Sequence, residues 1–560
     1  MARYLVIGGV AGGATAAARL RRLDEKADII IYERGSHVSY ANCGLPYYLG
    51  DVIRERNRLF VQTAAGFKNR FNIEARVGTE VTAINKKEKS ILVKDLATGK
   101  ISSSGYDRLV LSPGAEPVRP PIPGIDTDGI FTLRNVADTD RIKKHLHEKR
   151  PKKALVVGGG FIGLEMAENL RGLGIDVTVV EMADQVMANL DREIASEVHQ
   201  QLASQGVELI LKDGVISFEK TGNSIMTRLS SGREIEAGMV ILSIGVKPDT
   251  KLAREAGLAL GPRGGIAVNE FLQTSDPDIY AVGDAVEFTH PLTGQPVITF
   301  LAGPANKQGR IAADNIVNGN SKKYGGSIAT AVAKIFSLTV ASTGANEKML
   351  KSSGIPYMAS ITHSASHATY YPGATQMSVK ILFSPSDGTL YGAQIAGYDG
   401  VDKRIDVFSS VIGRGGNVRD LLEFDHAYAP PYSSAKDPVN IAGFAAENIL
   451  DGLSRIIHWH EMTGLDLSST VLIDVRTAGE FRMGTIPGAI NIPVDDLRGR
   501  LDGIPRNKKI VIFCAVGLRG HVAARMMLQS GFSDVSNLAG GYKTYSLAMN
   551  NIPGTAVTCC

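Results

Sequence analysis

The chain has 560 residues, of which 44% are hydrophobic and 21% are charged, and its formal net charge is +4 at pH 7. Because one hydrophobic core rarely serves more than about 250–300 residues, several domains are expected. The small charge, spread over interspersed acids and bases, argues against a nucleic-acid partner, and no run approaches the ~18 apolar residues of a membrane span.

The first residues predict a βαβ unit. Residues 4–7 form an apolar run that enters a glycine turn and an Ala- and Leu-rich helix, and a second apolar run, residues 29–32, ends at Glu33. We interpret this start as a buried strand rather than a signal peptide. The same pattern recurs about 150 residues later, where residues 154–157 enter a glycine turn and the next strand ends at Glu181. The repetition predicts two mononucleotide-binding folds.

Each glycine turn has the chemistry needed to hold a dinucleotide. Glycines let the backbone approach a pyrophosphate, the helix N-terminus presents unpaired N–H groups, and the distal acid accepts hydrogen bonds from ribose hydroxyls. The first turn has Val10 where the second has Gly160, a departure that leaves Gly8, Gly12 and Gly13 in place. Glu181 should favour NADH over NADPH, because a carboxylate repels a 2′-phosphate.

A single cysteine follows the first fold closely. Cys43 lies in the segment Ser39-Tyr-Ala-Asn-Cys-Gly-Leu-Pro46 and should lie beside the nucleotide of that fold. No second cysteine occurs before Cys514, so Cys43 is expected to cycle through a mixed disulfide, a persulfide or a sulfenate. With Cys559 and Cys560, the four cysteines make no disulfide framework, which favours a reducing, cytoplasmic setting.

The pattern changes after residue 320. Alternating stretches at residues 331–336 and 377–383 predict strands, and helical sequence follows to about residue 450. A polar joint at residues 451–454 precedes a last α/β segment of about 100 residues. The strands of that segment, such as residues 510–513, each end at a polar site.

Residues 1–450 resemble the CoA-disulfide reductase branch of the pyridine nucleotide-disulfide oxidoreductases. The resemblance rests on Gly8-Gly-Val-Ala-Gly-Gly13, the Ser-aromatic-x-x-Cys element ending at Cys43, Thr274-Ser-Asp-Pro-Asp-Ile-Tyr-Ala-Val-Gly-Asp284, His367-Ala-Thr-Tyr-Tyr-Pro-Gly373 and Tyr428-Ala-Pro-Pro-Tyr-Ser-Ser434. It implies FAD on the first fold, NADH on the second, coenzyme A as cofactor or substrate, and a homodimer. The implied domains are an FAD-binding domain (1–112 and 246–322), an NAD(H)-binding domain (113–245) and an α+β dimerisation domain (323–450).

The resemblance also implies which residues hold the dinucleotides. Asp284 would hydrogen-bond the FAD ribityl chain, and Phe161 would cover the flavin ring when the nicotinamide is absent. The full set is Gly8, Val10, Ala11, Gly12, Gly13, Glu33, Arg34, Asn42, Ser112, Pro113, Gly114, Gly158, Gly160, Phe161, Ile162, Gly163, Glu181, Gly245, Gly283, Asp284 and Ala302. Peroxide-reducing relatives have a histidine at the position of Ala11, which counts against peroxide chemistry. No metal is implied.

Coenzyme A would lie on the helix after the first glycine turn. Thr15, Arg19 and Arg22 are spaced by four and three residues, so they share one helix face. Guanidinium groups suit phosphates, although a basic helix face is often only a solvated surface. The implied set is Thr15, Arg19, Arg22, Ser39, Asn42, Lys307, Arg310 and Tyr428. Tyr428 is expected to reach the partner subunit's active site with Tyr370 or Tyr371 nearby, where a phenol would hydrogen-bond a thiolate or a leaving sulfur.

Residues 455–557 resemble a single rhodanese domain of α/β class. The resemblance rests on Leu472-Ile-Asp-Val-Arg476, Glu480-Phe481, Gly484-Thr-Ile-Pro-Gly-Ala-Ile-Asn491 and Cys514-Ala-Val-Gly-Leu-Arg519. Backbone N–H groups after Cys514 would lower its thiol pKa and stabilise a persulfide, with Arg519 adding charge or holding the loop. The alternative is an inactive docking module.

These patterns predict an NADH-dependent reductase of persulfides, polysulfides or CoA disulfides that works through Cys43, with sulfane sulfur carried by Cys514. Two alternatives stay open. One is a CoA-disulfide reductase for thiol balance with an incidental rhodanese domain, and the other is a slow redox sensor or sulfur carrier.

Overall fold

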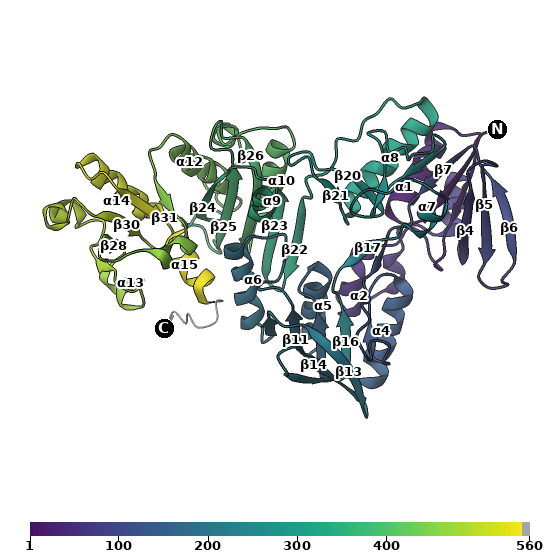
Figure 1. Ribbon diagram of the computed structural model, residues 1–560, viewed down its shortest axis with the longest axis horizontal. Helices are drawn as coiled ribbons and strands as arrows, with labels where there is room; N and C mark the ends of the chain where they lie inside the picture. The colour runs from purple at the N-terminus through teal and green to yellow at the C-terminus, as the bar shows by residue number, and fades with distance from the viewer. Residues whose placement is uncertain (551–560) are drawn as a thin grey trace. The chain divides into compact units, whose positions relative to one another are not determined.

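The computed structural model describes residues 1–550. It divides into two compact units. The first unit contains Met1–Asp184 and Gly206–Ala329, and the second contains Gln185–Gln205 and the chain from Thr330 onward. Figure 1 labels the elements of both units.

The first unit begins with a five-stranded parallel sheet in the order β19-β7-β1-β2-β3. Its strands are β1 (Arg3–Ile7), β2 (Asp28–Tyr32), β3 (Glu74–Arg76), β7 (Arg108–Leu111) and β19 (Ile279–Ala281). Most residues of β1, β2, β7 and β19 are buried, as expected of parallel strands covered on both faces, whereas those of the edge strand β3 are partly or fully exposed. The glycine turn after β1 leads into α1 (Ala11–Leu23), whose basic last turn suits the negative end of the helix dipole.

A second five-stranded parallel sheet, in the order β12-β11-β10-β16-β9, repeats this arrangement. Its strands are β9 (Ile130–Phe131), β10 (Lys153–Val157), β11 (Asp176–Glu181), β12 (Glu208–Leu211) and β16 (Met239–Leu242), and α5 (Phe161–Gly172) follows β10 as α1 follows β1. Three-stranded antiparallel sheets complete the repeat: β4 (Thr79–Asn85), β5 (Ser90–Asp95) and β6 (Ile101–Gly105) in the first copy, β13 (Val215–Thr221), β14 (Ser224–Leu229) and β15 (Glu234–Ala237) in the second.

The remaining elements of the first unit connect these sheets. The strands are β8 (Ala115–Pro117), β17 (Val246–Pro248), β18 (Ile266–Ala267), β20 (Val286–Thr289) and β21 (Pro296–Ile298). The helices are η1 (Asn42–Gly44), α2 (Leu45–Leu49), η2 (Arg56–Leu59), α3 (Ala64–Phe71), α4 (Val136–Lys149), α7 (Lys251–Glu255) and α8 (Ala302–Asn318).

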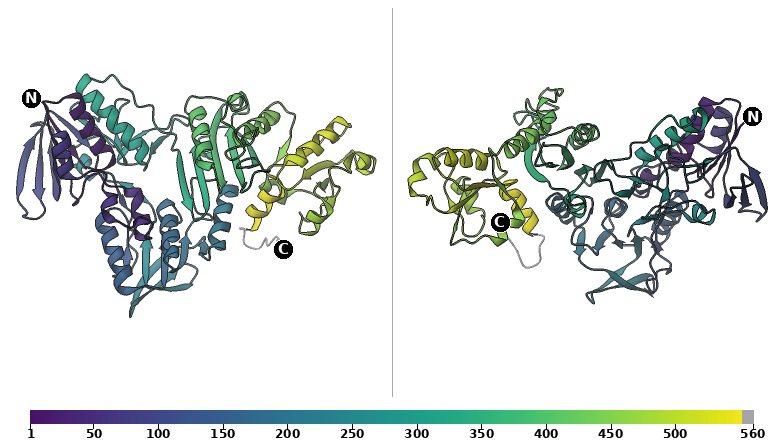
Figure 2. Two further views of the ribbon diagram at one scale, coloured as in Figure 1. Left: turned by 180° about the vertical axis from the view of Figure 1, so that it is seen from behind. Right: turned by 45° about the horizontal axis from the view of Figure 1, so that its top comes forward.

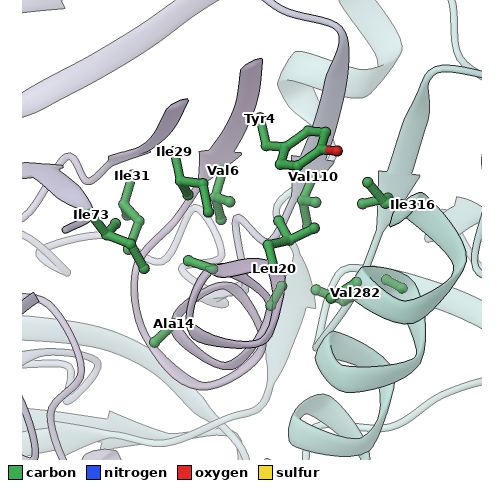
Figure 3. Close-up of a cluster of buried hydrophobic side chains, with 14 of the residues drawn as sticks. Tyr4, Val6, Ala14, Leu20, Ile29, Ile31, Ile73, Val110, Val282 and Ile316 are labelled. Atoms are coloured by element: carbon green, nitrogen blue, oxygen red, sulfur yellow. The ribbon is translucent and has the colours of Figure 1, made fainter. Parts of the chain in front are cut away.

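One hydrophobic core holds the first glycine turn in place. Figure 3 shows Tyr4, Val6, Ile29, Ile31 and Val110 from the parallel strands packed against α1 and α8, and the cluster includes Leu20 and Ile316 of those helices. Each fully buried aliphatic side chain of this kind stabilises the fold by about 1.5–3 kcal/mol. The two helices cross so closely that a Cβ atom on Gly309 would lie 2.4 Å from the carbonyl oxygen of Gly12.

The second unit contains a five-stranded antiparallel sheet in the order β22-β23-β26-β25-β24. The strands are β22 (Ala331–Ile335), β23 (Leu338–Gly344), β24 (Met358–Ala365), β25 (Gln376–Phe383) and β26 (Leu390–Gly397). They are joined or covered by α6 (Arg192–Ser204), α9 (Glu347–Ser352), α10 (Val401–Ile412), α11 (Asp420–Glu423) and α12 (Pro438–Leu450). In Figure 2, α10 and α12 can be followed along the sheet from behind.

The second unit ends in a parallel sheet in the order β27-β31-β30-β28-β29. The strands are β27 (Ile456–Ile457), β28 (Thr470–Asp474), β29 (Ile490–Asn491), β30 (Lys509–Phe513) and β31 (Val535–Leu538). The helices are η3 (Trp459–Gly464), α13 (Ala478–Arg482), η4 (Leu497–Gly503), α14 (Leu518–Gln529) and α15 (Gly541–Asn550). The expected α/β class is confirmed, and within residues 1–550 no helix is long and apolar enough to cross a membrane.

Candidate functional site

A cavity of about 340 Å³ opens above the carboxyl ends of the first parallel sheet. Its lining includes most of the dinucleotide residues predicted for the first fold: Gly8, Val10, Ala11, Gly12, Glu33, Arg34, Asn42, Ser112, Pro113, Gly114, Gly283 and Asp284. Ala302 begins α8 and is exposed, whereas Ala305, one turn later, lines the cavity. The position agrees with the general rule that ligands of open α/β sheets bind outside the carboxyl ends of the strands.

The first turn is shaped so that backbone comes close to whatever the cavity holds. A Cβ atom on Gly13 would lie 1.9 Å from the carbonyl oxygen of Gly8, so no larger residue fits there. The Glu33 carboxylate accepts hydrogen bonds from the N–H groups of Gly9 at 2.9 Å and Gly35 at 2.7 Å, and each oxygen keeps a lone pair for a ribose hydroxyl. These residues fit the adenosine end of a dinucleotide.

The second turn has the same geometry. A Cβ atom on Gly163 would lie 2.0 Å from the carbonyl oxygen of Gly158, and Glu181 accepts hydrogen bonds from the N–H groups of Gly159 at 2.7 Å and Ala183 at 2.8 Å. A Cβ atom on Gly160 would meet no atom within 4 Å, which leaves the approach to the α5 N-terminus open. The predicted equivalence of the two turns therefore extends to their hydrogen bonds.

The rest of the cavity lining was not among the predicted dinucleotide residues. Tyr40 is the aromatic residue of the element that ends at Cys43, and the others are Gly35, Ser36, His37, Ala115, Arg134, Asn135, Val136, Ala137 and Ala305. Asn135 is the N-cap of α4 and forms a capping box with Asp138, a signal that is readable in the sequence Asn-Val-Ala-Asp. Burial raises the pKa of Asp284 to about 6, and Arg134 opposes part of that rise.

Cys43 lies in η1, directly after the cavity residue Asn42, and it is a free and exposed cysteine. Protein atoms crowd the thiol on its remaining sides. That partial burial, with the nearby Glu165 and Asp284, raises the pKa of the Cys43 thiol. The thiol is therefore protonated at neutral pH unless a positive group or a covalent sulfur partner is present.

Glu165 is a site residue that the sequence analysis did not identify. It lies on α5, one turn after Phe161, and burial together with the neighbouring Glu168 raises its pKa to about 7. A carboxyl group that is half protonated at neutral pH close to the Cys43 thiol is able to exchange protons there. The only sequence signal was its place one turn after the second glycine motif.

The basic residues predicted to bind coenzyme A divide into two kinds. Arg19 is held by Asp314 of α8 at 2.7 Å, and Thr15 is hydrogen-bonded to Asn306 of the same helix. Arg22 is exposed on α1, and α8 contributes two exposed basic residues, Lys307 and Arg310. Ser39 has a left-handed backbone with φ of 47°, and its carbonyl accepts the N–H of Val61.

The two predicted phenols form a pair in the second unit. The hydroxyls of Tyr370 and Tyr428 lie 2.7 Å apart, and the side chains are 75% and 46% exposed. The hydrogen bond with Tyr370 raises the pKa of Tyr428. The buried Arg404 links the segments that carry the two tyrosines. It donates to the carbonyl of Ser366, shortly before Tyr370, and pairs with Asp437, shortly after Tyr428, at 2.9 Å. Tyr371 lies edge-on to His367 instead.

Cys514 directly follows β30 and is fully buried at the start of the loop that enters α14. The N–H of Gly517, whose φ of 106° few other residues adopt, donates to Cys514 Sγ at 3.1 Å. Arg519 interacts with the same thiol and is held by Glu480 through bonds of 2.8 and 2.6 Å. Both predicted roles of Arg519, charge and loop support, are therefore geometrically available. Cys559 and Cys560 lie outside the described residues.

Comparisons with known proteins agree with these sites. Residues 2–309 match the family described as pyridine nucleotide-disulphide oxidoreductase, residues 330–438 match its dimerisation domain, and residues 462–548 match the rhodanese-like domain. A curated Coenzyme A disulfide reductase of Staphylococcus haemolyticus is 35% identical over 80% of this chain and 100% of its own length.

Two solved structures span almost the whole chain. The reduced CoADR-RHD of Bacillus anthracis is 51% identical, with a TM-score of 0.96 and 99% of each chain covered. A NAD-dependent persulfide reductase of A. fulgidus is 40% identical, with a TM-score of 0.91, and the match covers 97% of this chain and 100% of that one. The chain therefore belongs to the pyridine nucleotide-disulphide oxidoreductase family and carries a rhodanese-like domain at its C-terminal end.

Proposed function

We propose that this protein is an FAD-dependent reductase that uses NADH to reduce CoA disulfides or persulfides at Cys43, while Cys514 carries sulfane sulfur. The observation that carries the proposal is the position of Cys43. It is the one cysteine before Cys514, and it directly follows the cavity residue Asn42 in a chain with two dinucleotide turns. The names of the relatives, a Coenzyme A disulfide reductase and a NAD-dependent persulfide reductase, support the substrate class.

The overall reactions balance with one hydride and one proton. NADH, H⁺ and a CoA disulfide give NAD⁺ and two CoA thiols, and NADH, H⁺ and a persulfide RSSH give NAD⁺, RSH and H₂S. A bound flavin supplies the two-electron transfer from NADH to sulfur. Glu181 and the N–H groups around Gly160 would hold the NADH, and Glu33 and Asp284 would hold the FAD.

Cys43 takes the covalent part of the reaction. Burial, with the nearby Glu165 and Asp284, raises the pKa of the Cys43 thiol and so disfavours a free thiolate; a mixed disulfide, which has neither charge nor ionisable proton, is a favourable resting form. Attack of a thiol on the bound sulfur needs a proton for the leaving thiolate. Glu165, with a pKa of about 7, and the pair of Tyr370 and Tyr428 are the proposed proton sources.

The proposal includes a homodimer and a reducing location. The dimerisation-domain match supports two protomers, in which the phenols of one protomer would serve the Cys43 site of the other. Exposed basic residues Arg22, Lys307 and Arg310 would take the phosphates of coenzyme A, with Arg19 held in position by Asp314. Free thiols at Cys43 and Cys514 suit the cytoplasm.

The reductase role is tested with Cys43→Ser. The variant should keep its flavin and accept electrons from NADH, because neither dinucleotide turn is changed, but it should not reduce CoA disulfide or persulfide. Stopped-flow flavin bleaching and steady-state NADH consumption separate the two steps. Cys514→Ser serves as the matched control. Full turnover by the Cys43 variant would show that another group carries the electrons.

The sulfurtransferase role is tested with Cys514→Ala. Transfer of sulfur from thiosulfate to cyanide should be abolished, and polysulfide reduction should slow, because a tethered carrier raises the effective sulfur concentration to about millimolar. A preformed CoA persulfide should be reduced at the parent's rate. Unchanged polysulfide reduction at limiting substrate would mean that the C-terminal domain acts independently. Relative turnover of CoA persulfide, polysulfide and CoA disulfide then identifies the preferred substrate.

A further inference from the structure

A chain of hydrogen-bonded side chains crosses the second unit from α6 to α15. His363 on β24 and Ser378 on β25 are paired neighbours, and their side chains contact at 2.8 Å between Nδ1 and Oγ. The other ring nitrogen of His363, Nε2, lies 2.9 Å from Oγ1 of Thr544 on α15. At the opposite end, the Ser378 hydroxyl contacts the carboxylate of Glu197 on α6. α15 lies beside α6 in Figures 1 and 2.

The ring of His363 joins the two ends of this chain. Burial lowers the pKa of His363 to about 3, so the ring is neutral and has a single N–H. Burial raises the pKa of Glu197, and the ammonium of Lys543 opposes that rise and favours the carboxylate. Ser378 donates to Glu197, and the two ring nitrogens of His363 bond Ser378 and Thr544, with the backbone of Gly540 as a further hydrogen-bond partner of the ring. The Thr544 hydroxyl is therefore bonded to a side chain of the antiparallel sheet.

The backbone of the same segment holds the Cys514 loop. The N–H of Tyr542 donates to the carbonyl of Cys514 at 2.8 Å, and the N–H of Lys543 donates to the carbonyl of Ala515 at 3.0 Å. The contact is tight, since a Cβ atom on Gly541 would lie 2.5 Å from the Cys514 oxygen. On its other side, a Cβ atom on Gly540 would lie 2.9 Å from a methyl carbon of Ile361 on β24. The segment lies between the loop and the sheet.

Orientation of these two peptide groups matters for the thiol. Because peptide groups are trans, holding the Cys514 and Ala515 carbonyls against α15 turns the N–H groups of Ala515 and Val516 away from α15, and the next N–H along the loop, that of Gly517, donates to Cys514 Sγ at 3.1 Å. Those N–H groups are the ones that stabilise a thiolate or persulfide. Arg519, held by Glu480, is the charged group on the other side of the loop.

We propose that Thr544, His363 and Ser378 are positioning residues for Cys514. In this chain the sulfurtransferase loop is held in its thiol-binding shape by the antiparallel sheet of the reductase portion, through the first turn of α15. The inference rests on the proposed role of Cys514 as a sulfur carrier. It adds that the loop depends on side chains outside the rhodanese-like domain.

The test uses Thr544→Val in the full-length flavoprotein, because valine keeps the shape and removes the hydroxyl, with Thr544→Ser as the control that keeps it. The valine variant should lose about fivefold in sulfur transfer from thiosulfate to cyanide, the effect of one buried hydrogen bond. Alkylation of Cys514 by iodoacetamide, followed by peptide mass analysis, should shift to higher pH. The serine variant should match the parent in both measurements.

Ser378→Ala removes the hydroxyl that contacts His363 Nδ1 and that also accepts from Lys543 of α15 at 3.4 Å, and it should reproduce the alkylation shift. NADH-dependent reduction of CoA disulfide should be unchanged in all three variants. Parent-like transfer and alkylation in both Thr544→Val and Ser378→Ala would overturn the proposal, and so would an equal loss of reductase activity, which would indicate general destabilisation. If the parent transfers no sulfur, the proposed function fails, whereas the alkylation profile still decides the positioning role.

Discussion

The buried ion cluster around Lys380 offers the sharpest test of how the second unit is held together. Lys380 on β25 is fully buried, and its ammonium lies 3.0 Å from Asp191, 3.0 Å from Glu193 and 2.6 Å from Glu347. Lys380→Met would leave three carboxylates without their common cation. Removal of one partner from a buried ion pair costs about 3–5 kcal/mol, and we expect a loss of that size.

The pH dependence should also change. In the parent, burial, with Glu193 and Glu347, raises the pKa of Asp191 although Lys380 opposes that rise, whereas the pKa of Glu347 is lowered. Burial raises the pKa of Glu347, but the ammonium groups of Lys380 and Lys351 lower it by more. The pKa of Glu347 therefore falls from 4.5 to about 2. A depressed carboxylate pKa stabilises the folded state above pH 4.5, and that contribution, about 3 kcal/mol, is lost as the pH falls towards 2. Without Lys380 the clustered carboxylates should titrate above their unfolded values, so the variant should gain stability as the pH falls from 7 to 5.

Trp459 provides the assay, because it is the one tryptophan in the sequence and lies in η3 of the same unit. Urea titrations followed by its fluorescence at pH 7.5 and 5.5 would compare the unfolding midpoints. Lys351→Met is the matched control, since that lysine bonds Glu347 at 2.9 Å from an exposed position and should change stability by about 1 kcal/mol or less. Equal midpoints and equal pH trends for Lys380→Met and the parent would refute the reasoning.

Three further predictions concern the active sites. Gly163→Ala places a Cβ atom against the Gly158 carbonyl, so NADH should reduce the flavin about 100-fold more slowly, while dithionite still bleaches it. The control is Gly172→Ala on the same helix, where a Cβ atom meets nothing within 4 Å, and it should behave like the parent. Glu480→Gln should lower sulfur transfer about tenfold, since it weakens the two hydrogen bonds that hold Arg519. The pH profile of sulfur transfer by the parent should show no carboxylate titration near pH 4.5, because Arg519 lowers the pKa of Glu480 to about 2. The parent should use NADH at a higher kcat/KM than NADPH, and Glu181→Gln should narrow that preference; equal use by the parent would show that nearby basic residues dominate the site.

Much of the first site could be predicted because its residues are close in sequence. A glycine turn after a buried strand, followed by a helix and a distal acid, is a local arrangement, and both copies have it with matching hydrogen bonds at Glu33 and Glu181. The rest of the cavity could not be predicted in this way. Arg134 and Val136 reach it from the start of α4, a segment whose sequence has no nucleotide-binding pattern.

The same contrast applies to the basic residues of α1. Their spacing predicted a shared helix face, which is a property of 3.6 residues per turn. Whether a guanidinium on that face is free depends on which helix crosses it, and α8 places Asp314 against Arg19 while Arg22 stays exposed. The sequence therefore predicted the face but not the partner.

The sequence by itself determined the two dinucleotide turns, the place of Cys43 directly after the first fold and the six-residue loop from Cys514 to Arg519, because these features are local in the chain. Only the tertiary structure decided that residues 185–205 fold with the antiparallel sheet and that Lys380, Ser378 and His363 face them as a polar layer. In the sequence, Ser378 and Lys380 read as the solvent-facing half of an alternating strand. Buried polar groups are stable only where segments distant in sequence supply opposite charges and hydrogen-bond partners. The fold sets the distances between these groups and their partners.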